Sequence, residues 1–342
     1  MKMPKLRRAI ACATLTAMLL APGLAQASGT CGGVNMLAAL EAARPSAVAD
    51  IRAAAHAWPN AEGLFWRVDK PGLAPSFLFG TFHATADEGV TIPAPVQNAL
   101  RGAKAVFTEI SAQEQAAMLA AFRQDPDLIT DWRGGTLDAA LTPELRAIAA
   151  RILPRHGLTY AQGNMLRPWF MQIALATPPC AIAAMAAGAR VLDDQIVDAA
   201  QGAGLPVRGM ETWPDALNHL INQPEDDARE ALALTIIFAD RIEDMRRTSR
   251  DLWRDEQTML IWELSRHFHA LAVGPVAADA ALDDMWNGLV VARNAGFVFA
   301  ASDDLAMGGA FVAVGALHLP GAGGMIERLR AMGYAVTRVP LR

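Results

Sequence analysis

The strongest constraint on the fold is a pattern that occurs twice, once near each end of the chain. Residues 76–110 and residues 310–339 each contain an apolar strand that ends in Gly-x-x-His, followed by a loop, a helix and a second strand. A strand–helix–strand segment of this kind favours parallel strands joined by a right-handed crossover. The pattern therefore predicts an α/β protein with a central, largely parallel sheet built from two such βαβ units.

Between these two units the sequence is mainly helical. Two stretches, at about residues 112–203 and 213–295, have the spacing of apolar side chains that is typical of helices. We expect residues 28–342 to form a single domain in which these two stretches are large helical insertions that cover the sheet. The remaining expected elements are a helix at 31–58 and strands at 64–68 and 205–210.

The amino-terminal residues predict export from the cytoplasm. Four Lys and Arg residues and no acid come first, an apolar run follows at 9–24, and Ala-Gln-Ala at 25–27 supplies the small residues that a signal peptidase reads. The apolar run is short for a membrane span, and an uncleaved anchor is the alternative. We expect residues 1–27 to be a cleaved signal peptide, and the protein to be periplasmic or secreted with no stable membrane span.

The charge of the chain bears on its partners. Cleavage after residue 27 removes four positive charges and no negative ones, so the net charge moves from −5 to about −9. Nucleic-acid binding needs clustered Lys and Arg side chains that contact phosphates. The acidic balance therefore argues against a nucleic-acid partner.

Two cysteines remain after the expected cleavage, Cys31 and Cys180. An even number of cysteines in an oxidising compartment favours a disulfide, which would join the new amino end to the middle of the chain. In the chain-entropy model a loop of this length contributes about 4–5 kcal/mol to stability. The alternative is a pair of separate buried thiols.

Four side chains that bind ligands or transfer protons follow four predicted strands. These side chains are His83, Glu109, Glu211 and His318. In open parallel sheets, ligands bind beyond the carboxyl ends of the strands. Taken singly, each histidine is more often a structural residue, and each glutamate a solvated strand end or a charge at a helix terminus. Their convergence predicts a functional site at this edge of the sheet.

A glycine stands three residues before each histidine of the repeated pattern, at Gly80 and Gly315. A residue without a Cβ atom lets the backbone turn sharply or lets another group approach closely. The acidic pair Asp193-Asp194 lies in a helical pattern instead, and we expect both side chains to be solvated.

The motif segments of this chain resemble those of the TraB/GumN family in content and in order. The match covers nearly the whole chain after the signal peptide, and an ordered set is more specific than a single Gly-x-x-His. Met210 departs from the family, since many members have leucine there. The matching segments are residues 77–83, 107–110, 209–212 and 311–321 and the pair Arg293-Asn294.

The family includes proteins described as metal-dependent proteases, and it has been related in fold to erythromycin esterases and haem-binding proteins. The resemblance thus implies a metal-dependent hydrolase that acts on a peptide or a small molecule. The alternative is a non-catalytic periplasmic binding protein that holds haem, a metal or a saccharide in the same pocket.

The resemblance also implies which residues bind the metal. A divalent transition metal, Mn, Co or Zn, would be held by His83, Glu109 and His318. Two imidazoles and one carboxylate leave a position open for water, and the metal lowers the pKa of that water.

Three further residues complete the implied site. Glu211 is the candidate general base or a fourth metal ligand. Arg293 would stabilise a developing oxyanion or hold a substrate carboxylate, and Asn294 would orient a ligand. The alternative for this last pair is a plain helix end with an exposed arginine.

Overall fold

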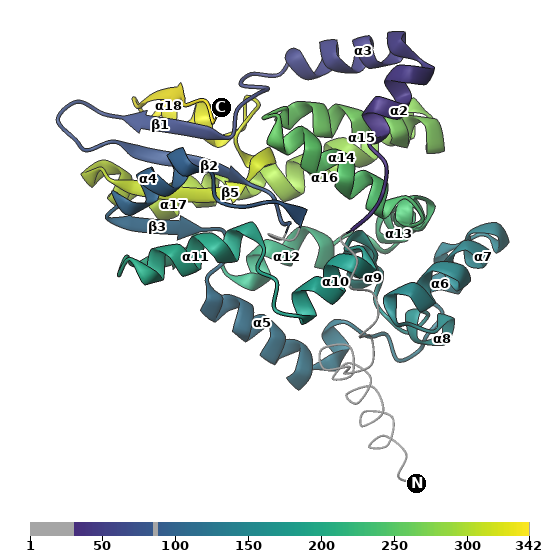
Figure 1. The fold of residues 1–342 in the computed structure, drawn as a ribbon. Coiled ribbons are helices and arrows are strands. Elements are labelled where there is room, and N and C mark those ends of the chain that lie inside the picture. Colours follow the sequence, from purple (N-terminus) through teal and green to yellow (C-terminus); the bar gives the residue numbers. More distant parts are fainter. Residues whose placement is uncertain (1–30, 85–87, 342) are drawn as a thin grey trace. The chain divides into compact units, whose positions relative to one another are not determined.

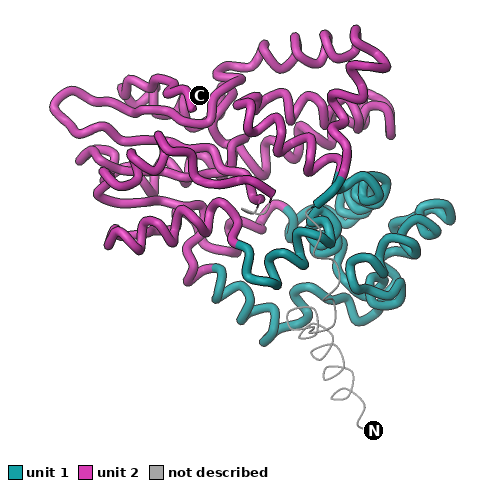
Figure 2. The backbone as a smooth tube through the Cα atoms, viewed as in Figure 1, with its two compact units in different colours: residues 1–32, 115–189, 220–243 teal, residues 33–114, 190–219, 244–342 magenta. Residues whose placement is uncertain are grey.

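The structure is a computed structural model that describes residues 31–84 and 88–341. The predicted signal peptide, residues 1–27, lies outside the described residues. The described chain divides into two compact units, which Figure 2 shows in different colours. The expectation of a single domain stays a prediction. The described residues of unit 1 are 31–32, 115–189 and 220–243, and those of unit 2 are 33–84, 88–114, 190–219 and 244–341.

Unit 2 is built on a six-stranded sheet within the described residues. Figure 1 labels four of its strands, β1, β2, β3 and β5. Its strands are β1 (Phe65–Asp69), β2 (Ser76–Thr81), β3 (Ala105–Thr108), β4 (Val207–Gly209), β5 (Ala310–Gly315) and β6 (Ala335–Arg338). The strand order is β4-β3-β5-β2-β1-β6. The first four strands in this order are parallel, whereas β1 is antiparallel to both of its neighbours. The predicted α/β fold with a largely parallel sheet is confirmed.

Helices make up most of the rest of the described chain. In unit 2 they are α2 (Met36–Ala43), α3 (Pro45–His56), α4 (Ala94–Arg101), α11 (Leu192–Gly202), α15 (Thr258–Val273), α16 (Pro275–Trp286), a π-helix η4 (Asn287–Val291), α17 (Ala292–Met307), a 3-10 helix η5 (Ala316–His318) and α18 (Met325–Ala331). Three helices run across the boundaries between the units: α5 (Ala112–Gln124), α12 (Trp213–Ile221) and α14 (Ile242–Arg254).

The two predicted strand–helix–strand units are interleaved in the sheet. The first unit runs from β2 through α4 to β3, and the second runs from β5 through α18 to β6. β5 lies between β2 and β3 and pairs with both in parallel. Thr81 at the end of β2 is therefore opposite Gly315 at the end of β5. This order brings the two Gly-x-x-His segments side by side at one edge of the sheet.

Helices cover both faces of the sheet, because side chains along each strand alternate between the faces. On β5, Val312 and Val314 pack in the core that contains α17 and α18. Phe311 and Ala313 pack on the opposite face, with α4 and α11. A strand that is buried on both faces is apolar along its length, which is why β5 is a continuous apolar run in the sequence.

The amino-terminal helix that the sequence predicts over residues 31–58 is two helices. The first, α2, ends at Ala43 with Arg44 as its cap, and α3 begins at Pro45. Proline lacks the N–H that would continue the hydrogen bonds of α2, and it is well placed in the first turn of α3. The two helices pack with α15 and α16 in a separate apolar cluster.

Unit 1 is helical throughout its described residues. Its core contains Leu137, Ile152, Leu232 and other apolar side chains of its own helices. Cys31 and Cys180 form the predicted disulfide, with their Cα atoms 5.3 Å apart. The helices that lie wholly in unit 1 are η2 (Pro126–Leu128), α6 (Thr136–Ala140), α7 (Pro143–Ile152), η3 (Leu153–His156), α8 (Tyr160–Gly163), α9 (Pro168–Ala176), α10 (Pro179–Ala186) and α13 (Glu225–Ala239).

Among the described residues, no helix alone is both long enough and apolar enough to cross a membrane. Helices α9 and α10 reach the length and apolar character of a span only when taken together, and they are bent by 80° at the break between them.

Candidate functional site

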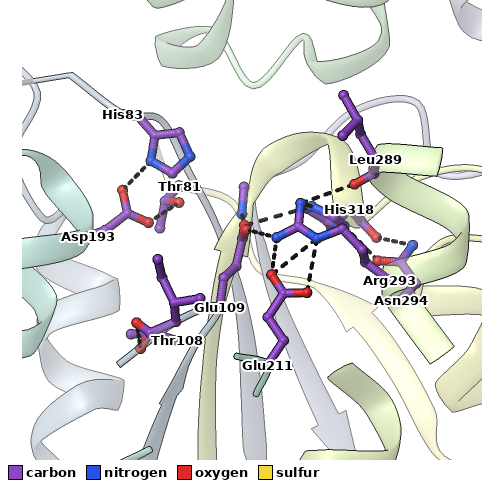
Figure 3. A network of polar contacts seen from close by, with 12 residues as sticks. Thr81, His83, Thr108, Glu109, Asp193, Glu211, Leu289, Arg293, Asn294 and His318 are labelled. Carbon is purple, nitrogen blue, oxygen red and sulfur yellow. Dashed lines mark hydrogen bonds and ion pairs between the residues drawn. The ribbon is translucent and has the colours of Figure 1, made fainter. Parts of the chain in front are cut away.

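The four side chains expected at strand ends lie at one edge of the sheet in unit 2 (Figure 3). His83 follows β2, Glu109 directly follows β3, Glu211 follows β4, and His318 ends the 3-10 helix η5 that continues from β5. The four strands are parallel neighbours, so their carboxyl ends meet at the same edge. The structure therefore brings together the strand ends that the sequence singles out.

Arg293, near the start of α17, is the centre of an ion network in this group. Its Nη2 donates to Oε2 of Glu109 at 2.6 Å and also to Glu211, and its Nε lies 3.1 Å from both oxygens of Glu211. Its Nη1 donates to the carbonyl oxygen of Leu289 at 3.1 Å and to Nε2 of His318 at 3.4 Å. A guanidinium has five N–H groups, and these contacts engage all of them. Arg293 is thus a buried anchor for two carboxylates, not an exposed helix end.

The short π-helix before α17 contributes to this arrangement. Residues 287–291 form η4, in which the regular α-helical hydrogen bonding is interrupted. A π-helical turn leaves backbone carbonyls without their usual partners and is frequent at functional sites. The carbonyl oxygen of Leu289, within this segment, accepts from the side chain of Arg293 four residues later. This π-helix is not among the elements expected from the sequence.

Glu109 is held ionised by its surroundings. Its Oε1 accepts from the backbone N–H of Gly315 at 2.6 Å, and its Oε2 accepts from Arg293. Burial alone would raise the pKa of Glu109. At the low pH where Glu109 titrates, the charges of protonated His318, of Arg293 and of His83, with the Gly315 N–H, outweigh burial and lower the pKa to about 2. At neutral pH Glu109 is therefore a carboxylate and a weak base.

Glu211 differs from Glu109 in its protonation equilibrium. Burial raises the pKa of Glu211, and the hydrogen bond and the charge of Arg293 offset only part of this rise. The neighbouring carboxylate of Glu109 acts in the same direction as burial. Of the two glutamates, Glu211 is therefore the stronger base.

His318 is buried and neutral, and Asn294 determines its tautomer. The side-chain NH2 of Asn294 donates to the carbonyl oxygens of His318 and Gly323, at 3.2 and 3.0 Å. Its Oδ1 must therefore accept, and it lies 2.7 Å from Nδ1 of His318. The proton of the imidazole is on Nδ1, and Nε2 presents its lone pair to Arg293. Burial lowers the pKa of His318 to about 4.

His83 belongs to a second group beside the ion network. Its Nδ1 donates to Oδ2 of Asp193 at 2.8 Å, and Oδ1 of Asp193 accepts from the hydroxyl of Thr81 at 2.7 Å. The backbone N–H of Leu192, at the start of α11, donates to the carbonyl oxygen of Ala84 and holds the helix against this loop. The charge of Asp193 raises the pKa of His83 to about 9. The His83 side chain is 68% exposed, so its Nε2 is accessible to a substrate.

Asp193 corrects one expectation of the sequence analysis. We expected a solvated side chain, whereas Asp193 is largely buried between Thr81 and His83. An acid in the first turn of a helix has an ordinary explanation in the helix dipole, so the sequence carries no signal of this contact. Only the position of α11 beside the end of β2 reveals it.

The two motif glycines allow close approach and are not sharp turns. A Cβ atom on Gly315 would lie 3.2 Å from Oε1 of Glu109, whose carboxylate binds the N–H of the same residue. A Cβ atom on Gly80 would lie 3.0 Å from Cα of Ala316, in the neighbouring segment. Gly315 has φ of −51°, which any residue adopts. Both glycines therefore bring the ends of β2, β3 and β5 together.

The donors that the resemblance implies for a divalent metal do not fit a metal ion in this arrangement. Nε2 of His318 and Oε2 of Glu109 accept hydrogen bonds from Arg293, and His83 is bonded to Asp193 at some remove from them. Across residues 31–84 and 88–341, no group of three or more His, Cys, Asp or Glu side chains is placed to hold a metal ion. The expected metal stays a prediction.

Fold and site together define a mixed α/β protein with a charged site at the carboxyl ends of parallel strands. The model of the TraB/PrgY/gumN family matches residues 64–338, which is most of the chain. The chain belongs to this family, and the resemblance seen in its motifs is confirmed. No curated protein and no solved structure was found to match the chain.

Proposed function

We propose that this protein is a hydrolase that cleaves an acyl bond in a peptide or a small-molecule substrate. The observation that carries the proposal is the exposed imidazole of His83, held on the carboxylate of Asp193, beside a buried network of compensated charges. An imidazole whose Nδ1 is fixed by a carboxylate presents its Nε2 in a defined direction, as proton transfer requires.

In the proposed reaction His83 supplies the proton to the leaving group. Its pKa of about 9 keeps the imidazole protonated at neutral pH. Glu211, whose pKa is raised, accepts the proton of the attacking water. Water forms the new bond to the acyl carbon, the bond to the leaving group breaks, and the leaving group departs with the proton from His83.

Arg293 and Glu109 have a positioning role in this proposal. All N–H groups of Arg293 bind protein acceptors, so the guanidinium holds Glu109 and Glu211 in place rather than a substrate oxyanion. Glu109, in turn, is fixed by the Gly315 N–H, and its negative charge adds to that of Asp193 in favouring protonated His83. No step in this reaction passes through a metal.

We further propose that the protein acts in the periplasm or outside the cell, after cleavage of residues 1–27. The Cys31–Cys180 disulfide supports this location, because disulfides form and persist in oxidising compartments. Export would also place the site within reach of extracellular peptides.

The proposal is tested by hydrolysis of a panel of peptides and esters by the purified protein. We expect turnover that His83→Gln reduces by about 10²-fold or more, the usual contribution of a positioned proton donor. The matched control is His56→Gln, which changes an exposed histidine of α3 that pairs with Glu62. Equal activity of His83→Gln and wild type, or no turnover of any substrate by folded protein, would refute the proposal.

A further inference from the structure

The atoms around Arg293 have the form of a cation site. Oε2 of Glu109 and Oε1 of Glu211 both bind the same guanidinium nitrogen, Nη2, and Nε2 of His318 faces the adjacent Nη1 at 3.4 Å. These side chains come from three separate segments of unit 2 and converge on one positive charge (Figure 3). Two carboxylates and one imidazole are also a common ligand set for a divalent transition metal.

The network also has the charge requirement of a cation site. The side chains of Glu109, Glu211 and His318 are at most 16% exposed, and two carboxylates in such a place require a compensating positive charge. The guanidinium of Arg293 supplies that charge and does not lose its proton in proteins. A divalent ion would need the same oxygen atoms and the same lone pair of His318. The two cations therefore exclude each other.

We propose that the guanidinium of Arg293 takes the place of a divalent metal in this protein. The wild-type chain then binds no metal at this centre, because Glu109, Glu211 and His318 are spaced around the guanidinium and not around an ion. Once the guanidinium is removed, these three side chains can move together and bind a metal. This ligand set differs from the one that the family resemblance implies, because it omits His83 and makes Glu211 one of three required ligands. The inference rests on the geometry alone and holds whether or not the protein is a hydrolase.

The test compares wild type with Arg293→Met, which removes the charge and keeps an unbranched side chain. Each protein is purified in its mature form and stripped of metal with a chelator. It is then equilibrated with Mn²⁺, Co²⁺ or Zn²⁺ and desalted, and the amount of bound metal per chain is measured. We expect less than roughly 0.1 metal per wild-type chain and about one Co²⁺ or Zn²⁺ per Arg293→Met chain. Bound metal should also raise the Tm of Arg293→Met by several degrees and leave that of wild type unchanged.

The matched control is Arg246→Met. Arg246 is also a largely buried arginine, with 13% of its side chain exposed, and it binds both oxygens of Glu88 at 2.6 and 2.7 Å. Removing the Arg246 guanidinium leaves one carboxylate, that of Glu88, and no imidazole. One carboxylate is too few ligands for a metal, so we expect Arg246→Met to bind none. A second control, His318→Gln in the Arg293→Met background, should lose the metal because one of the three ligands is gone.

Two results would overturn the proposal. One is stoichiometric metal in wild type that His318→Gln abolishes, since the metal and Arg293 would then coexist. The other is a folded Arg293→Met variant that binds none of the three metals. If Arg293→Met does not fold without metal, recovery of the folded state with Co²⁺ or Zn²⁺ supports the proposal, and failure to recover with any of the metals counts against it.

Discussion

The side-chain amide of Asn294 fixes which nitrogen of His318 carries the proton. The amide is fully buried, its NH2 group is held by two backbone carbonyls, and its oxygen faces Nδ1 of His318 at 2.7 Å. Nε2 is left as an acceptor, and it meets an N–H of Arg293. A second-layer hydrogen bond of this kind commonly determines what a histidine presents to its site.

This relationship predicts the effect of Asn294→Asp. A carboxylate beside Nδ1 favours the protonated imidazole, so the pKa of His318 should rise from about 4 by at least one unit. The measurement is an NMR titration of the imidazole C–H resonances. The resonances of His83 serve as the internal reference, because its partner is Asp193. An unchanged titration of His318 would show that Asn294 does not control its protonation.

A second prediction concerns the carboxylate that holds His83. Asp193→Asn keeps a hydrogen-bond acceptor and removes the negative charge that raises the pKa of His83 to about 9. The pKa should fall toward the ordinary value near 6.5. The alkaline limb of any hydrolytic activity, which falls as His83 loses its proton, should move down in pH by the same amount.

The matched variant for this prediction is Thr81→Val. It removes the other hydrogen bond to Asp193 and leaves the charge beside His83 in place. We expect a much smaller change in the pKa of His83 than Asp193→Asn gives. Equal shifts in the two variants would mean that the orientation of Asp193, and not its charge, sets this pKa.

Stability should fall as the pH is lowered from about 6.5 to 4, because His318 is kept neutral in the folded protein. The folded-state pKa is about 4 and the unfolded one about 6.5, so only the unfolded chain takes up this proton within that window. The loss is at most about 3 kcal/mol. Glu109, with its pKa lowered from 4.5 to about 2, adds a further loss below pH 4.5.

Urea unfolding at pH 7.5, 5.5 and 4.5 measures this pH dependence. His318→Gln should be less stable than wild type at pH 7.5, and its stability should change less between pH 6.5 and 4. A pH dependence in His318→Gln as steep as that of wild type would assign the effect to other groups. His83 and Glu211 oppose this loss, since the raised pKa of each favours the protonated folded state as the pH falls.

The disulfide gives a fourth prediction. Cys31 and Cys180 are 149 residues apart in sequence, so their bond closes a long loop. The double variant Cys31→Ser and Cys180→Ser should lower the free energy of unfolding by about 2–5 kcal/mol. A thiol reagent should find no free cysteine in the oxidised protein after signal cleavage. Wild type treated with a reductant is the control, and it should match the double variant in urea.

The sequence determined the parallel sheet because its signals are local. Apolar runs such as residues 310–314, Gly-x-x-His segments at their ends, and the helices that follow them are each visible within a few residues. The rule that ligands bind at the carboxyl ends of parallel strands then places His83, Glu109, Glu211 and His318 at one edge. The structure confirms that placement.

The pairing of these residues was decided by tertiary structure alone. The burial of Asp193 against His83 and the position of Arg293 between two carboxylates join residues that are 82 to 184 positions apart in the sequence. The insertion of β5 between β2 and β3 is likewise a matter of strand order in the sheet. Periodicity reports which side chains face a core, but it carries no information on which distant element lies opposite. Buried charges pair strongly only after the fold has removed them from water. An unpaired charge is costly there, so each carboxylate of the site must lie beside a positive group.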